Sequence, residues 1–120
     1  MILVIGGRAS GKLDYIRSLG YQDDEIAEAR LDERPVLYGL QELLRQKPEA
    51  AAQLLPELKG KEVVVCDEVG LGIVPLDKED RAYREAVGRL CVQLAREAEQ
   101  VVRLVCGIPQ VIKDTTTEAR

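Results

Sequence analysis

Two short stretches of this sequence carry side chains at spacings that could do chemistry. The first is the glycine-rich segment Gly6-Gly7-Arg8-Ala9-Ser10-Gly11-Lys12, which follows the apolar run 2–5 and precedes an expected helix over 11–19. This order of strand, glycine loop and helix, with the spacing G-x-x-x-x-G-K, is typical of a phosphate-binding loop. The glycines let successive backbone N–H groups converge on an anion, and the helix start adds further donors. The lysine then bridges the outer phosphates of a bound nucleotide.

We therefore predict that the whole loop contacts a nucleotide, ATP or GTP, through Gly6, Gly7, Arg8, Ala9, Ser10, Gly11, Lys12 and Leu13. Leu13 departs from the motif, because a Ser or Thr hydroxyl that ligates magnesium normally stands there. Binding is consequently better supported than catalysis. The alternative interpretation is a tight turn without a ligand, with Leu13 on the buried face of the helix.

The second stretch is Asp67-Glu68, which ends the apolar run 63–66. An acid at the carboxyl end of a strand near a phosphate-binding loop can hold Mg²⁺, and a neighbouring Glu can orient a nucleophile. Both residues are candidate metal ligands and, with Lys12, candidate catalytic residues. The alternative is a solvated acidic turn. The glycines at 70 and 72 fit a loop that a ligand approaches closely, and they also fit an ordinary surface turn.

These residues need an α/β scaffold to position them. The apolar runs 2–5, 63–66 and 101–106 predict strands, with 107–109 closing the last one, and further strands could lie in the middle of the chain. Helices are expected over 11–19, from Pro35 to 44, over 48–55 and over 77–98; Pro56 should end or kink the third, and 21–32 should be a loop with one helical turn. The expected fold is a P-loop NTPase-like three-layer sandwich with a small, mainly parallel sheet, built as one domain over 1–113 with a polar tail over 114–120.

Composition narrows the function further. A net charge of -4 and a pI near 5.0 argue against general binding to nucleic acid or to a membrane surface. No apolar run reaches a membrane span of about 20 residues, and the first residues lack a signal-peptide pattern, so a cytoplasmic location is expected. The three cysteines lack CxxC spacing and the chain has no histidine, so we expect buried thiols rather than a zinc site. The absence of Trp and Phe predicts an aliphatic core without an aromatic base-stacking platform.

Three segments resemble one known family. Glu68-Val69-Gly70-Leu71-Gly72-Ile73-Val74-Pro75, Gly88-Arg89-Leu90 and Gly107-Ile108-Pro109 are similar to the carboxyl half of the adenosylcobinamide kinase / adenosylcobinamide-phosphate guanylyltransferase family of cobalamin biosynthesis. The glycine loop at 6–12 is similar to the phosphate-binding loop of that family. The resemblance covers 1–20 and 61–113, whereas 21–60 shows none.

The resemblance implies an oligomeric α/β enzyme that phosphorylates a hydroxyl of cobinamide with ATP or GTP and then transfers GMP through a histidine. The glycine loop would cradle the phosphates, and Lys12 would offset charge on the transferring phosphoryl group. A substrate loop beside the nucleotide and the corrinoid would comprise Glu68, Val69, Gly70, Leu71 and Gly72.

Departures from the family leave three hypotheses open. Without histidine the guanylyl route is excluded, Leu13 removes a hydroxyl ligand, and Asp67 replaces the Asn that the family usually has. The chain is also shorter than family members. The first hypothesis is a reduced kinase that uses Lys12 with Asp67 or Glu68. The second is an inactive module that binds nucleotide or corrinoid, or that acts in assembly. The third is a structural relic that binds only an adventitious anion.

Overall fold

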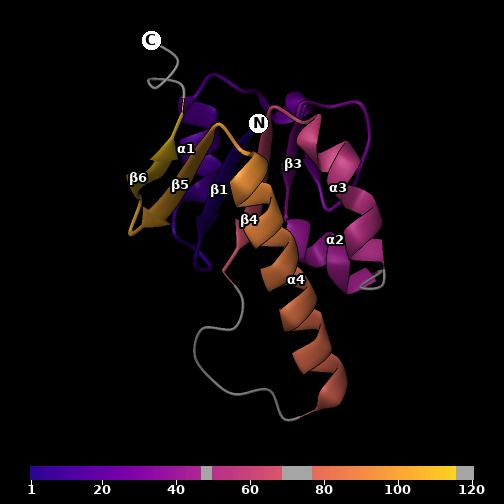
Figure 1. The fold of residues 1–120 in the computed structure, drawn as a ribbon. Helices are drawn as coiled ribbons and strands as arrows, with labels where there is room; N and C mark the ends of the chain where they lie inside the picture. The colour runs from indigo at the N-terminus through magenta and orange to yellow at the C-terminus, as the bar shows by residue number, and fades with distance from the viewer. Residues whose placement is uncertain (47–49, 69–76, 116–120) are drawn as a thin grey trace.

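The computed structural model describes residues 1–46, 50–68 and 77–115, which form a six-stranded sheet flanked by helices (Figure 1). The strand order is β2 (Ile26–Glu28), β3 (Val36–Tyr38), β4 (Val63–Asp67), β1 (Ile2–Gly6), β5 (Gln100–Val105) and β6 (Ile108–Asp114). All neighbouring pairs are parallel except β5 and β6, which are antiparallel. The predicted α/β fold with a mainly parallel sheet is confirmed.

The central strands are buried on both faces, which explains their continuous apolar runs. Leu3 and Val64 point into one core, which α2 (Leu40–Gln46), α3 (Ala51–Lys59) and α4 (Lys78–Glu97) cover. Val4 and Val65 point into the other core, which includes Ile16 of α1 (Lys12–Ser18). The sheet is therefore the middle of three layers, with both cores mainly aliphatic.

Helix α4 begins and packs as its sequence predicts. The carboxylate of Asp77 accepts a hydrogen bond from the backbone N–H of Asp80 at 2.6 Å, which caps the helix. Its buried stripe consists of Tyr83, Val87, Leu90 and Leu94, with Ala98 just after the end. In Figure 1 this long helix crosses the front of the sheet beside α2 and α3.

The middle of the chain differs from the sequence prediction. The segment 36–38, expected to lie in the helix that begins at Pro35, forms strand β3. Helix α2 starts only after Gly39, whose φ of 82° is a left-handed backbone conformation that belongs neither to a strand nor to an α-helix. The segment 21–32, expected as a loop with one helical turn, does contain a 3-10 turn at Asp23–Glu25, but strand β2 follows it.

Two further details of the prediction need correction. Pro56, expected to end or kink α3, does not end it, and the helix continues to Lys59, because its last turn carries the fully buried Leu58 into the core. The strand expected over 101–106 is β5 and ends at Val105, close to the predicted position, but it is not the last strand. Cys106 and Gly107, with φ values of 50° and 77°, form a two-residue hairpin turn that leads into β6. Asp114, expected to open the polar tail, is the last residue of that strand.

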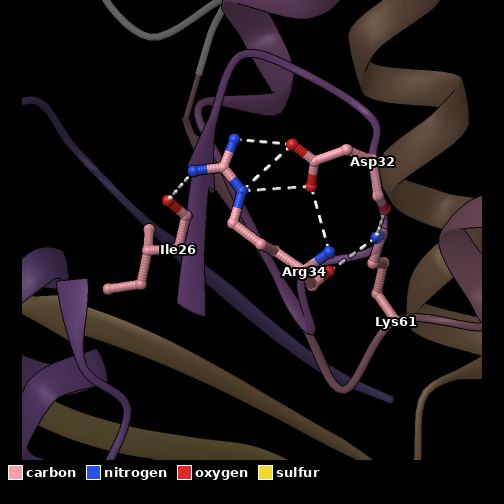
Figure 2. A network of polar contacts seen from close by, with 4 residues as sticks. All are labelled: Ile26, Asp32, Arg34 and Lys61. Carbon is pink, nitrogen blue, oxygen red and sulfur yellow. Dashed lines mark hydrogen bonds and ion pairs between the residues drawn. The ribbon is translucent and has the colours of Figure 1, made fainter. Parts of the chain in front are cut away.

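A polar cluster connects the amino-terminal ends of three parallel strands (Figure 2). The carboxylate of Asp32 accepts hydrogen bonds from Nε of Arg34 at 3.0 and 3.1 Å and from its backbone N–H at 3.0 Å. Nη1 of Arg34 donates to the carbonyl of Ile26 at 3.2 Å. Nζ of Lys61 donates to the carbonyls of Asp32 and Arg34, the latter at 2.6 Å. These contacts fix the entries to β2, β3 and β4.

Candidate functional site

The glycine loop joins the end of β1 to the start of α1 at the carboxyl edge of the parallel strands. Its backbone is tightly folded, with φ of 59° at Ala9 and 88° at Gly11, and the N–H of Ser10 bonds the carbonyl of Gly7 at 3.2 Å. A Cβ at Gly6 would lie 2.5 Å from Oγ of Ser10 and 3.0 Å from the carbonyl of Leu104. A side chain at Gly6 would therefore collide with the loop and with β5, so this position requires glycine.

The hairpin turn between β5 and β6 supports the loop from outside. The N–H of Gly107 donates to the carbonyl of Ser10 at 2.9 Å. A Cβ at Gly11 would lie 3.1 Å from the Cα of Gly107, so the two glycines pack backbone against backbone. This contact gives Gly107 a structural role in holding the loop.

Lys12 lies inside the loop and is 3% exposed. Its Nζ donates to the carbonyl of Gly7 at 2.6 Å, and lies 3.4 Å from both the carbonyl of Gly6 and Oγ of Ser10. The same Nζ forms an ion pair with Oδ1 of Asp67 at 2.8 Å. A buried ammonium requires such partners, and the carboxylate at the end of β4 supplies the charge. The structure thus brings together two of the three predicted catalytic side chains.

Asp67 is held by residues that the sequence prediction missed. Its backbone N–H donates to Oε1 of Gln41 at 2.9 Å, and the hydroxyl of Tyr83 donates to the carbonyl of Gln41 at 2.8 Å. The guanidinium of Arg45 stacks over the Tyr83 ring, 4.3 Å from its centroid. Helices α2 and α4 thereby fix the end of β4. The available signal was Gln41 itself, a polar residue between the apolar positions Leu40 and Leu44.

Glu68 has a different partner from Asp67. Its carboxylate pairs with Arg103 of β5, with Nε at 2.8 Å and Nη2 at 3.3 Å, and its N–H bonds the carbonyl of Gly6 at 2.8 Å. Arg103 was not predicted, because nothing in the local pattern of an apolar strand marks its one arginine as a site residue. The remaining substrate-loop residues Val69, Gly70, Leu71 and Gly72 lie outside the residues that the structure describes.

Cavities flank the Lys12–Asp67 pair. One of about 570 Å³ is lined by Arg8, Gln41, Glu42, Arg45, Asp67, Glu68, Tyr83 and Arg84. Another, of about 210 Å³, is lined by Tyr38 and by residues 9–14 of the loop and α1. Burial and the charge of Asp67 raise the pKa of Tyr38, which keeps this hydroxyl protonated. Both cavities lie at the carboxyl ends of parallel strands, where open α/β sheets place their ligands.

The acidic side chains near the glycine loop fit a metal ion that binds together with a nucleotide better than a metal ion that the protein holds permanently. Among the described residues, no group of three or more His, Cys, Asp or Glu side chains could hold a metal ion. Leu13 is half-buried and lines the 210 Å³ cavity, while Ile16 takes the fully buried position of α1. Asp67 and Glu68 remain as adjacent carboxylates, and Mg²⁺ bound with phosphates needs only one or two of these.

Comparison with known proteins decides the family. The family model described as cobinamide kinase / cobinamide phosphate guanyltransferase matches residues 24–112, well over half of the chain. The chain belongs to this family. The match spans most of 21–60, so the expectation of no resemblance there is wrong. It does not include the glycine loop, whose assignment depends on its motif and on the geometry above.

Curated relatives agree with the family model. The bifunctional adenosylcobalamin biosynthesis protein CobP of Pseudomonas aeruginosa is 38% identical over 65 residues, which are 54% of this chain and 38% of that protein. The bifunctional adenosylcobalamin biosynthesis proteins CobU of Escherichia coli and Salmonella typhimurium are 44% and 42% identical over 64 residues, 53% of this chain and 34% of each relative. The matches thus cover little more than a third of the length of these relatives. In the part of the chain described, no helix has the length and apolarity needed to cross a membrane.

Proposed function

We propose that this chain binds ATP or GTP in the loop 6–13 and acts in cobalamin biosynthesis, with phosphoryl transfer to a hydroxyl of cobinamide as its reaction. The observation that carries the proposal is the 2.8 Å ion pair between Lys12 and Asp67, which joins the glycine loop to the end of β4 beside two cavities. A lysine with this position exchanges its carbonyl partners for phosphate oxygens when a nucleotide enters.

Each residue has a defined role in this proposal. The loop amides and Lys12 bind and orient the phosphates, and Lys12 offsets the charge that develops during transfer. Asp67 and Glu68 would hold Mg²⁺ bound with the nucleotide, and that ion would neutralise phosphate charge. Arg103 and Gln41 are positioning residues, because they contact Glu68 and the backbone of Asp67 respectively. Corrinoid binding belongs to the same proposal and is supported by family membership.

Histidine-linked guanylyl transfer is not part of the proposed function. The sequence contains no histidine, so this chain cannot form a phosphohistidine intermediate by itself. One observation favours a second candidate function, a nucleotide- or corrinoid-binding module without turnover. The side chain that lines the loop cavity at position 13 is a leucine, which provides no hydroxyl for a magnesium ion.

Calorimetric titration with ATP and GTP, with and without Mg²⁺, tests the nucleotide site. Lys12→Ala should weaken binding by roughly tenfold to a hundredfold, because hydrogen bonds to a charged group contribute about 1.5–3 kcal/mol. Lys61→Ala is the matched control, since Lys61 also donates to two backbone carbonyls but lies at the opposite edge of the sheet. Unchanged affinity in Lys12→Ala would refute the phosphate-binding role of the loop.

Turnover separates the two candidate functions. If the chain is a kinase, its incubation with cobinamide, nucleotide and Mg²⁺ should give a phosphate ester of cobinamide, which mass spectrometry detects. Lys12→Ala should not form this ester. Tight nucleotide binding without any ester would instead establish the binding module. The cytoplasmic location inferred from the sequence remains a prediction that fractionation of cells would check.

Assembly into a homo-oligomer is also proposed. The hairpin of β5 and β6 exposes large aliphatic side chains at Val105, Ile108, Val111 and Ile112, whose exposed fractions lie between 46% and 68%. β6 is an edge strand of the sheet, and exposed aliphatic side chains at a sheet edge favour association with another chain. Light scattering should give a mass above that of one chain, and Ile112→Glu should reduce it to the monomer mass.

A further inference from the structure

Helix α4 contains a glycine that neither its backbone nor its packing explains. Gly88 lies in the middle of this 20-residue helix, where glycine is less stable than alanine. Its φ is not positive, and a Cβ added at this position would meet no heavy atom within 4 Å. The fold itself therefore does not require a glycine here, and the position has room for a side chain.

That room belongs to a cavity of about 280 Å³ between α4 and the carboxyl ends of the central strands. Ile5, Val87, Gly88 and Cys91 form the apolar part of its lining, and Asp67, Glu68 and Arg103 form the charged part. Because Ile5 and Arg103 are register partners in β1 and β5, one wall of the cavity is the sheet and the other is the helix.

The lining also corrects the expectation of three buried thiols. Cys91 is only partly buried and lines this cavity. Cys106 is exposed in the hairpin turn, and Cys66 alone is buried as expected.

The two parts of the lining determine what the cavity can bind. The apolar part suits an aliphatic chain. At the charged part, the carboxylate of Glu68 is fixed by Nε of Arg103 at 2.8 Å. The side chain of Asp67 stays 27% exposed although its Oδ1 pairs with Lys12. Carboxylates accept hydrogen bonds and repel anions, so a ligand with a donor such as a hydroxyl fits this end.

The same two carboxylates also line the 570 Å³ cavity, which Arg8 of the glycine loop borders. Positions 84, 88 and 91 lie on one face of α4, because residues three and four apart are neighbours on a helix. Arg84 lines the larger cavity and Cys91 the smaller one. A side chain at position 88 would therefore lie where the two cavities adjoin.

We propose that the 280 Å³ cavity binds an aliphatic alcohol, whose chain lies against Ile5, Val87 and the space left by Gly88 and whose hydroxyl donates to Asp67 or Glu68. Gly88 is then a specificity-determining residue, because a larger side chain would occupy the space of the ligand.

The role of this alcohol as phosphoryl acceptor rests on the proposed function. Its oxygen bonds to the terminal phosphorus of the nucleotide, the bond from that phosphorus to its bridging oxygen breaks, and a nucleoside diphosphate leaves. The hydroxyl proton passes to the carboxylate that it contacts and then to water.

Titration of the nitrogen-labelled protein with n-butanol, followed by two-dimensional NMR, tests the cavity itself. The amide signals of Ile5, Val87 and Cys91 should shift in the parent and stay unchanged in Gly88→Leu. Butyrate has the same number of carbon atoms but an anionic end, which Asp67 and Glu68 repel, so it should shift these signals less. Parent signals that do not respond to n-butanol, or that respond equally to butyrate, would overturn the proposal.

Equilibrium dialysis with cobinamide and nucleotide-loaded protein tests whether the cavity is the acceptor site. Gly88→Leu should weaken cobinamide binding by about tenfold or more, since even one methylene in a pocket changes binding by this factor, and Gly88→Ala should have a smaller effect. Leucine and alanine both favour a helix more than glycine does, so neither variant should melt at a lower temperature than the parent. Val92→Leu is the matched control, at an exposed position of α4 that does not line the cavity.

The outcomes separate this inference from the proposed function. Cobinamide binding in Gly88→Leu equal to that of the parent, or an equal loss of ATP affinity in this variant, would overturn the assignment as acceptor site. A parent chain that binds no cobinamide would instead count against the proposed function, and the n-butanol titration would still decide what the cavity binds.

Discussion

The two ends of the parallel strands carry clusters of similar charged residues that differ in what surrounds them. At the amino ends, Asp32, Arg34 and Lys61 contact each other and nearby backbone carbonyls, as Figure 2 shows. At the carboxyl ends, Lys12 and Asp67 also form a close pair, but they lie at the wall of cavities lined by further polar groups. None of the three amino-end residues lines a cavity described above.

The comparison shows that an ion pair alone does not identify a site. The amino-end cluster joins residues of neighbouring strand entries, so removing it should loosen the fold. The carboxyl-end pair combines a strand end, a tight loop and open space, which is the arrangement that a ligand can use. Variants of one cluster should therefore change binding and variants of the other should change stability.

Asp67→Asn tests the carboxyl-end pair, and its effect should be on nucleotide binding. An amide is a poorer ligand for Mg²⁺ than a carboxylate, so the affinity for ATP in the presence of Mg²⁺ should fall by about tenfold or more, a loss of about 1.4 kcal/mol. Without Mg²⁺ the affinity should not fall, because a negative charge near the phosphates has been removed. Titration calorimetry measures both. Asp32→Asn is the control. An equal loss of ATP affinity in the two variants would show that the two clusters do not differ in their role in binding.

Lys61→Met should act on stability instead. It removes the donor to the carbonyls of Asp32 and Arg34, which should lower the free energy of unfolding by about 1–3 kcal/mol. Urea denaturation followed by circular dichroism gives this value. Lys59→Met serves as a control, since Lys59 is exposed and its ion pair with Glu97 is 3.5 Å long. A Lys61→Met protein as stable as the parent would show that the amino-end cluster does not hold the strand entries.

The pH dependence of the stability of Asp32→Asn also tests whether the amino-end cluster stabilises the fold. Hydrogen bonds from Arg34 lower the pKa of Asp32 from 3.8 to about 2. A carboxyl whose pKa is lower in the folded state contributes stability above its unfolded pKa and loses that contribution as pH falls toward the folded value. The melting temperature of the parent should therefore exceed that of Asp32→Asn at neutral pH. The gap should close between about pH 4 and pH 2, whereas a pH-independent gap would contradict the assignment.

The smallest effect is expected at Tyr21, whose hydroxyl donates to Glu62 at 2.9 Å near the start of β4. Burial and Glu62 raise the pKa of Tyr21 to about 12. A group whose folded pKa is raised contributes stability below its unfolded pKa, near 10, and loses it as pH rises through the folded value. Tyr21→Phe should be slightly less stable than the parent at pH 8, and the difference should vanish by about pH 12. Thermal melts over this pH series provide the test.

The parts of the fold that the sequence predicts are those with one unambiguous local pattern. The strands at 2–5 and 63–66 are continuous β-branched and aliphatic runs, and α4 has a capping Asp77 followed by a regular apolar stripe. Strand β3 was missed because Val36 and Leu37 continue the helical spacing of α2, and only the backbone angle at Gly39 separates the two elements. Tertiary pairing with β4 decides such a short segment.

The residues of the candidate site likewise differ in whether a local sequence pattern predicts them. Lys12 and Asp67 belong to local motifs, and the structure places them in contact. Gln41 and Arg103 carry no motif, because their importance arises only when α2 and β5 pack beside the end of β4. Cys106 was expected inside because its neighbours are apolar, but it lies in a hairpin turn that faces solvent.

The hairpin turn that packs against the glycine loop also limits where residues or new chain ends could be introduced into this protein. Turn tips of this kind normally accept inserted residues and new chain ends, which is why circular permutation succeeds there. Here the N–H of Gly107 donates to the carbonyl of Ser10 and its Cα packs closely against Gly11, so that displacing the turn would remove this support from the loop. A circular permutant with its new chain ends between Cys106 and Gly107 would therefore keep the sheet, but its glycine loop would lose the backbone conformation that binds an anion.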